Sequence, residues 1–336
     1  MKLINKVISS KRIIILILLV CVFLSGCISE TQEEERVYRV GILSGLDVLY
    51  NISDGFRAGM TELGYVEGEN IVYDLHRSDF DIANYKNVVQ KFVEDKVDLI
   101  FVFPTEASIT AKEVSEGTGI PVVFAFSVVE DTNLVESVRQ PGGHITGVRD
   151  ATIDVTVKRL ETFKEIVPEA ERVWIAYQKN NPTIPPQLEV LRPAASSMGI
   201  TLVEVPAESI EDVRADLDDR SASDDIGIDA IMLIAEPLMV MPDNLKVAGE
   251  FAIKHKIPIG GFLLDERIII FGYENDLNEI GELAASTADK ILRGTPAGTI
   301  PVITPESKLV INYKAAQEFG LTIPQGLLNR ASEIIR

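Results

Sequence analysis

Side chains that could carry out catalysis are few in this chain and far apart. The three histidines are His76, His144 and His255, and none has a second histidine four residues away, as a helical zinc site would need. The sequence has no G-x-S-x-G turn for a serine nucleophile and no G-K-[ST] phosphate-binding loop. We therefore expect a protein that is not an enzyme and that binds neither a cofactor nor a metal ion.

The two cysteines, Cys21 and Cys27, belong to an N-terminal segment with a distinct composition. Four basic residues precede an apolar run from Ile13 to Leu24, which is followed by Ser25 and Gly26. This order is typical of a secretory signal. The run has roughly a dozen residues, fewer than the about 20 that a membrane-spanning helix needs, so a cleaved signal is favoured over a retained anchor.

Leu24-Ser25-Gly26-Cys27 resembles the lipobox of prokaryotic lipoproteins, in which the cysteine becomes the first mature residue and carries the lipid. The alternative, a buried structural thiol, is less favoured because the polar residues 29–36 offer no core face. We expect a signal peptide over 1–26 and a lipidated tether over 27–36. The protein would then be attached to the cell membrane on its extracytoplasmic side, without a disulfide or a thiol nucleophile in its mature domain.

The chain is strongly acidic, with 51 Asp and Glu against 32 Lys and Arg and a net charge of −19. Loss of the first 26 residues makes the net charge still more negative, because all the charged residues of that segment are basic. No basic stripe offsets this charge, so nucleic acid is not an expected partner.

From Val37 onward, apolar runs bounded by turn residues alternate with helical patterns. This alternation predicts an α/β fold with parallel sheets. The strands are expected to begin near 38, 70, 97 and 120 in the first half and near 172, 200, 228 and 257 in the second. The similarity of the halves predicts two lobes, and the first helix is expected to be capped by Ser53 and to bury Phe56 and Met60.

Ligands of open parallel sheets bind at the carboxyl ends of the strands. The loops expected to form the site are 44–51, 104–108, 127–131, 147–153, 178–183, 235–242 and 263–266.

Several stretches together resemble the ABC-transporter substrate-binding family that includes tryptophan- and tyrosine-binding lipoproteins. They are GFRAGMTELGYVEGENI from Gly55, VDLIFVFPTEAS from Val97, IPVVFAF from Ile120, PGGHITGV from Pro141, RLETFKEIVPEAERVWIAY from Arg159 and LVINYKAAQEFGLTIPQGLLNRASEII from Leu309. The resemblance implies a type I periplasmic-binding-protein fold, with two Rossmann-like lobes, three crossovers and a cleft. The expected lobes are 37–148 with 275–292, and 149–274 with 293–336.

The resemblance also implies site residues. Thr105 and Ser108 match a hydroxyl-bearing loop at a helix start, where backbone amides could bind a carboxylate. Asp150, in GVRD, and Asp265 are the candidates for binding an ammonium group, although Asp150 is equally well placed to cap the next helix. The family's serine before this aspartate is replaced here by Arg149.

Other candidate contacts come from the loops that follow the strands. Ser44, Ser127 and Glu236 are polar residues at these positions. Tyr50, Phe126 and Tyr177 lie near strand ends and could stack on a ring, although strand-end aromatics more often belong to the core.

The function that these observations favour is a lipid-anchored extracytoplasmic solute-binding protein of an ABC importer. It would capture a small organic ligand, preferably amino-acid-like, and deliver it to a permease driven by a separate ATPase. The alternative is a sensory receptor of the same fold that reports the ligand to a membrane signalling partner.

Overall fold

The first sheet contains five strands in the order β2-β1-β3-β4-β5, and every neighbouring pair is parallel. These elements belong to a computed structural model that describes residues 36–262 and 267–336. The strands are β1 (Tyr38–Ser44), β2 (Ile71–Arg77), β3 (Leu99–Phe103), β4 (Val122–Ser127) and β5 (Ile145–Arg149).

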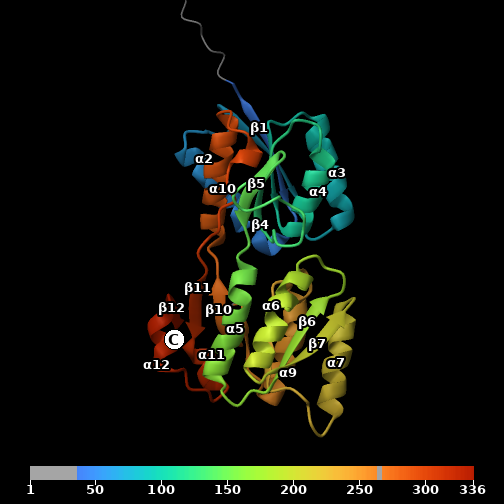
Figure 1. The fold of residues 1–336 in the computed structure, drawn as a ribbon, viewed down its shortest axis with the longest axis vertical. Coiled ribbons are helices and arrows are strands. Elements are labelled where there is room, and N and C mark those ends of the chain that lie inside the picture. The colour runs from blue at the N-terminus through green and yellow to red at the C-terminus, as the bar shows by residue number, and fades with distance from the viewer. Residues whose placement is uncertain (1–35, 263–266) are drawn as a thin grey trace, which may run out of the picture. The chain divides into compact units, whose positions relative to one another are not determined.

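Both faces of the first sheet are buried under helices, which explains the continuous apolar runs of its strands. In β3, Phe101 packs towards one helical layer and Val102 towards the other. One layer contains α2 (Asn51–Glu62), after the short η1 (Asp47–Leu49), and α10 (Leu277–Leu292); the other contains α3 (Ile82–Glu94) and α4 (Thr105–Ser115). Figure 1 shows these two pairs of helices on opposite sides of the sheet.

The second sheet contains seven strands in the order β12-β11-β10-β9-β8-β6-β7. They are β6 (Arg172–Gln178), β7 (Thr201–Ala207), β8 (Ala230–Met232), β9 (Ile259–Gly261), β10 (Ile269–Glu274), β11 (Lys308–Asn312) and β12 (Glu333–Ile335). Their pairs are parallel except β10 with β11, which is antiparallel.

Helices cover both faces of the second sheet as well. In β6, Ile175 packs towards one layer and Trp174 towards the other. The first layer contains α5 (Thr152–Ile166), α6 (Ile184–Ser197), α11 (Tyr313–Glu318) and α12 (Gln325–Arg330); the second contains α7 (Ile210–Ala222), α8 (Pro237–Val240) and α9 (Pro242–His255). Each sheet with its helices is called a lobe below, and residues 38–336 together form one compact unit.

Helix α10 belongs to the first lobe although it follows strand β10 of the second. Its Ile280, Ala284 and Ala288 share a core with β1 and β3. It lies against α2 so closely that a Cβ on Gly281 would be 2.2 Å from the backbone oxygen of Ile52. The chain therefore crosses between the lobes after β5 and again between β10 and α10.

The segment after α10 also packs with the first lobe. Ala297 and Ile300, in and next to η2 (Ala297–Thr299), are buried in its core, and Ile303 forms a bridge with Val148. This packing favours a third crossover after Ile303, whereas the predicted lobe limit is Leu292. On this packing we propose that residues 38–149 and 277–303 form the first lobe.

The predicted class of fold, two lobes with parallel sheets, is confirmed. The eight predicted strands correspond to β1 to β4 and β6 to β9, whereas the antiparallel pair of β10 and β11 was not predicted. Ser53 does not cap α2, because the helix already begins at Asn51, and the Ser53 hydroxyl donates to the backbone oxygen of Tyr50 instead.

The predicted signal and tether, residues 1–26 and 27–36, fall almost entirely outside the described residues. Within the part of the chain that the structure describes, no helix is long and apolar enough to cross a membrane.

Candidate ligand-binding site

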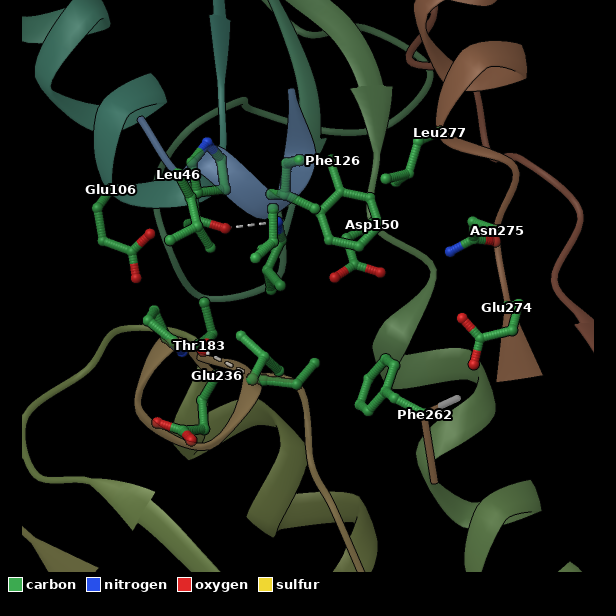
Figure 2. A pocket seen from close by; sticks show the side chains of 18 of the residues that line it. Leu46, Glu106, Phe126, Asp150, Thr183, Glu236, Phe262, Glu274, Asn275 and Leu277 are labelled. Carbon is green, nitrogen blue, oxygen red and sulfur yellow. Dashed lines mark hydrogen bonds between the residues drawn. The ribbon is translucent and has the colours of Figure 1, made fainter. Parts of the chain in front are cut away.

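A cavity of about 240 Å³ lies where strands of both sheets end, and residues of both lobes line it. This volume is slightly smaller than the roughly 300 to 1,000 Å³ of typical small-molecule pockets. Figure 2 shows its side chains, which come from the loops after the strands and from the crossing segments. The cavity is therefore suited to one small organic molecule.

The wall from the first lobe is mainly apolar. Leu46 and Leu49 follow β1, Phe126 and Val128 follow or end β4, and Pro104 precedes α4. The hydroxyl of Thr105 accepts a hydrogen bond from the backbone N–H of Val128 at 3.0 Å, which joins the loops after β3 and β4. These loops form a continuous apolar surface on which a ligand body can be buried.

The second lobe and the crossing segments supply the remaining wall. Its members are Thr183 before α6, Ala235, Glu236, Pro237 and Val240 around α8, Phe262 after β9, and Asp150, Tyr273, Glu274, Asn275 and Leu277 at the crossovers. In Figure 2, the side chains of Asp150, Glu274 and Asn275 face the space between the lobes.

Three nearly buried carboxyl groups give the cavity its polar character. Glu106, Asp150 and Glu236 are 8%, 4% and 4% exposed. Burial raises the pKa of Glu106, Asp150 and Glu236, that of Glu236 to about 7, because a desolvated carboxylate loses the water that stabilises its charge. A ligand cation next to these groups would favour their ionised forms.

Two of these carboxyl groups, those of Asp150 and Glu236, also accept hydrogen bonds at the start of a helix. The Thr152 N–H donates to Oδ1 of Asp150 at 2.8 Å, before α5. The carboxylate of Glu236 accepts from the backbone N–H groups of Leu238 at 2.9 Å, Met239 and Gln178. Asp150 therefore both supports a helix start and lines the cavity.

Glu106 links the two lobes. Its Oε1 accepts a hydrogen bond at 2.8 Å from Nδ2 of Asn181, in the loop between β6 and α6. Asn181 in turn accepts bonds from the backbone and the hydroxyl of Thr183 through its Oδ1. A side chain of the α4 start thus contacts the other lobe beside the cavity.

A buried arginine lies behind the cavity wall. Arg159 of α5 is 1% exposed, its Nε donates to the backbone oxygen of Gly261 at 3.0 Å, and its guanidinium lies 3.8 Å from the ring centre of Phe262. Burial lowers the pKa of Arg159 to about 10, while the charges of Asp150 and Glu274 oppose that change. The cation stabilises the acidic groups, but Phe262 forms the cavity wall in front of it.

Of the residues predicted to bind the ligand, Thr105, Asp150 and Glu236 line this cavity, and so does Phe126. Ser44, Tyr50, Ser108, Ser127 and Tyr177 are not among its lining residues. Cys27 and Asp265 lie outside the residues that the structure describes.

The predicted residues away from the cavity have local contacts. Ser108 and Ser127 are completely buried, and their hydroxyls lie 2.8 Å apart. The Tyr177 hydroxyl donates to Glu204 at 2.7 Å, and the Tyr50 ring lies under Arg77. Ser44 is buried, and its hydroxyl has no hydrogen-bond partner within 36–262 and 267–336.

Arg149, which occupies the serine position of the family turn, points into an ion-pair network. It contacts the carboxylates of Glu130 and Asp154, and its Nε donates to the hydroxyl of Thr304 at 2.8 Å. It does not line the cavity.

The histidines also lie elsewhere. His144 and His255 each hydrogen-bond to a serine, and His76 to Asp74. Among the described residues, no group of three His, Cys, Asp or Glu side chains could hold a metal ion.

Sequence reasoning missed Glu106 and the crossing residues Tyr273, Glu274, Asn275 and Leu277. The predicted helix from Asn275 in the first lobe implies that the preceding strand end passes the cleft, but it does not identify the side chains that face the cavity. Glu106 was not singled out because Thr105, Glu106 and Ser108 are all polar residues in the first turn of α4, and only the fold decides which of them face the cavity.

Comparison with known proteins agrees with this fold. A family model described as ABC transporter substrate binding protein matches residues 40–335. The chain is 29% identical over 268 residues to a tyrosine-binding protein of Clostridioides difficile strain R20291, covering 77% of this chain and 73% of that protein.

Solved structures show the same architecture. A conserved domain protein from Vibrio cholerae has a TM-score of 0.80 and 25% identity, and an ABC domain from Streptococcus pneumoniae in complex with L-Trp has a TM-score of 0.79 and 22% identity. Each alignment covers 89% of this chain and 100% of the solved one. The fold is therefore that of the type I periplasmic binding proteins, and the chain belongs to the ABC transporter substrate-binding protein family.

Proposed function

We propose that this chain is the extracytoplasmic binding component of an ABC importer and that it captures a small amino-acid-like molecule. By this we mean an ammonium group on an apolar or aromatic body. The observation that carries the proposal is the buried carboxylate of Asp150 beside the apolar wall of Phe126, Phe262 and Val128 in a cavity between two lobes. The names of the relatives that bind tyrosine and tryptophan support this ligand class.

The binding chemistry follows from the two kinds of wall. The ligand body would lie against Leu46, Phe126 and Phe262, where apolar burial contributes about 25 cal/mol per Å². The ammonium group would donate to Asp150, in a charge-assisted hydrogen bond worth about 1.5 to 3 kcal/mol. Contacts with both lobes favour the arrangement in which both walls touch the ligand.

Delivery of the ligand would take place at the membrane. A cleaved signal at 1–26 and a lipid on Cys27 would hold the protein at the membrane, and its partners there would be a permease and its ATPase. The acidic tether of residues 27–36 would connect the lipid to the binding unit.

The proposal is tested by isothermal titration calorimetry of the purified full-length chain in detergent. The titrants are amino acids, their amine analogues, nucleosides and small peptides. We expect binding heat from amino acids or amines with aromatic or large apolar bodies. Heat from nucleosides or peptides alone would contradict the amino-acid-like ligand.

Asp150→Asn tests the assigned role of this residue. The substitution should weaken binding roughly 10- to 150-fold, because the ammonium loses its anionic partner. Asp154→Asn is the matched control, since Asp154 lies on the same α5 but outside the cavity lining. Equal effects of the two substitutions would remove Asp150 from the site.

Delivery is tested by deleting the gene for this chain and measuring uptake of the labelled ligand into cells. Loss of uptake supports the importer. Unchanged uptake with loss of a ligand-induced transcriptional response would instead support the sensory receptor.

A further inference from the structure

The charged side chains of the cavity wall are all acidic. Glu106, Asp150, Glu236 and Glu274 line it, and no lysine, arginine or histidine does so among the residues that the structure describes. A ligand carboxylate would therefore meet like charges on this wall.

A helix start can bind a carboxylate without any basic side chain, because its free N–H groups attract anions. At two helix starts, those of α5 and α10, some of these groups already bind carboxylates of the chain itself. At α5 the N–H of Thr152 donates to Asp150 at 2.8 Å, and at α10 the N–H of Asn278 donates to Asp276 at 2.9 Å.

The buried cation Arg159 already interacts with groups of the chain itself. Arg159 is not a lining residue, its guanidinium stacks on Phe262 at 3.8 Å, and it compensates the charges of Asp150 and Glu274. One nitrogen, Nη1, has no hydrogen-bond partner among the described residues. It is the competing candidate for a ligand carboxylate, and the experiment below distinguishes the two.

We propose that this cavity selects small primary amines with an apolar or aromatic body and discriminates against the same molecules when they carry a carboxylate. The inference rests on the proposed function, whose ligand class includes both amino acids and amines. It narrows this class to amines that carry no carboxylate. The physical reason is that the ammonium group gains acidic partners, whereas a carboxylate would lose its water beside Glu106 and Asp150 without gaining a basic side chain in the wall.

The test uses matched pairs in calorimetry of the full-length chain at neutral pH. The pairs are tyramine with tyrosine, tryptamine with tryptophan, phenethylamine with phenylalanine, and isoamylamine with leucine. In the pair that binds best, we expect the amine to bind at least about tenfold more tightly than the amino acid.

Each outcome has a distinct meaning. Equal affinities of the amine and the amino acid overturn this inference but leave the proposed function intact. Tighter binding of the amino acid does the same, and it would point to Nη1 of Arg159 as the partner of the ligand carboxylate. If neither member of any pair binds, the proposed function fails and this inference fails with it.

A variant pair gives a second measurement. Glu106→Gln removes one of the repelling charges, so the preference for the amine should decrease at least about threefold. Glu113→Gln is the matched control, because Glu113 is an exposed carboxylate on the same α4 and outside the cavity lining. An unchanged preference for the amine in Glu106→Gln would contradict the assigned role of Glu106. If this variant does not fold, the affinities of the amine and amino-acid pairs for the unaltered chain test the inference by themselves.

Discussion

At Glu236, burial and hydrogen bonding act in opposite directions on the same carboxyl group. Three backbone N–H groups donate to it, which favours the ionised form. Burial favours the neutral form and dominates, so that the pKa rises to about 7. The carboxyl group of Glu236 therefore changes from neutral to ionised near neutral pH. Its protonation should contribute measurably to the free energy of unfolding.

The sign of this contribution follows from proton linkage. Because the folded pKa of Glu236 lies above its ordinary value of 4.5, the native state binds a proton more strongly than the unfolded state does. The free energy of unfolding should therefore decrease as pH rises from about 5 to 8, by on the order of 3 kcal/mol from this group.

Glu236→Gln should remove most of this dependence, because glutamine resembles the protonated acid at every pH. The variant should be close to the parent in stability at pH 5 and more stable than it at pH 8, as measured by urea unfolding. Glu250→Gln, an exposed acid on α9, is the control that should keep the parent's slope. Identical slopes in all three proteins would show that Glu236 does not titrate in this range.

At the scale of elements, the contact between α2 and α10 depends on two glycines. A Cβ on Gly55 would be 2.2 Å from the backbone oxygen of Asn278, and one on Gly281 would be 2.2 Å from that of Ile52. Backbone atoms cannot move aside as flexible side chains do, so a larger residue would push the helices apart.

Gly281→Ala should therefore destabilise the protein by about 1 to 3 kcal/mol in urea unfolding. Ligand affinity should decrease as well, because α10 begins with the cavity residue Leu277. Gly326→Ala is the control: it lies in α12 with no atom within 4 Å of its Cβ, so the change should be neutral or stabilise by up to about 1 kcal/mol. A Gly281→Ala variant as stable as the parent would contradict this packing argument.

At the scale of the whole molecule, the predicted lipid on Cys27 would determine where the protein is found. A single acyl chain binds a membrane only marginally, so the two chains of a diacylglyceryl group would be needed for stable attachment. Metabolic labelling with radioactive palmitate should label the parent chain and Cys21→Ser, but not Cys27→Ser. Label in Cys27→Ser, or its loss in Cys21→Ser, would show that the assigned cysteine is wrong.

The architecture was predictable because its signals are local in the sequence. Runs such as LIFVF at Leu99 and WIAY at Trp174 are apolar on both alternating faces, which is the pattern of a strand covered by helices on both sides. The antiparallel β11 was harder to assign, since its pairing with β10 joins segments separated by the whole of α10. Ser53 failed as a cap because α2 begins two residues earlier.

The candidate site was only partly predictable, for a physical reason. The sequence by itself determined the two-lobed fold and the loops that meet at the strand ends, because hydrophobic periodicity specifies strands and helices locally. Only the tertiary structure decided that Glu106, rather than the buried Ser108, faces the cavity, and that Glu274 and Asn275 join its wall. These positions depend on contacts between lobes far apart in the chain, and no local pattern encodes which side of a loop meets them.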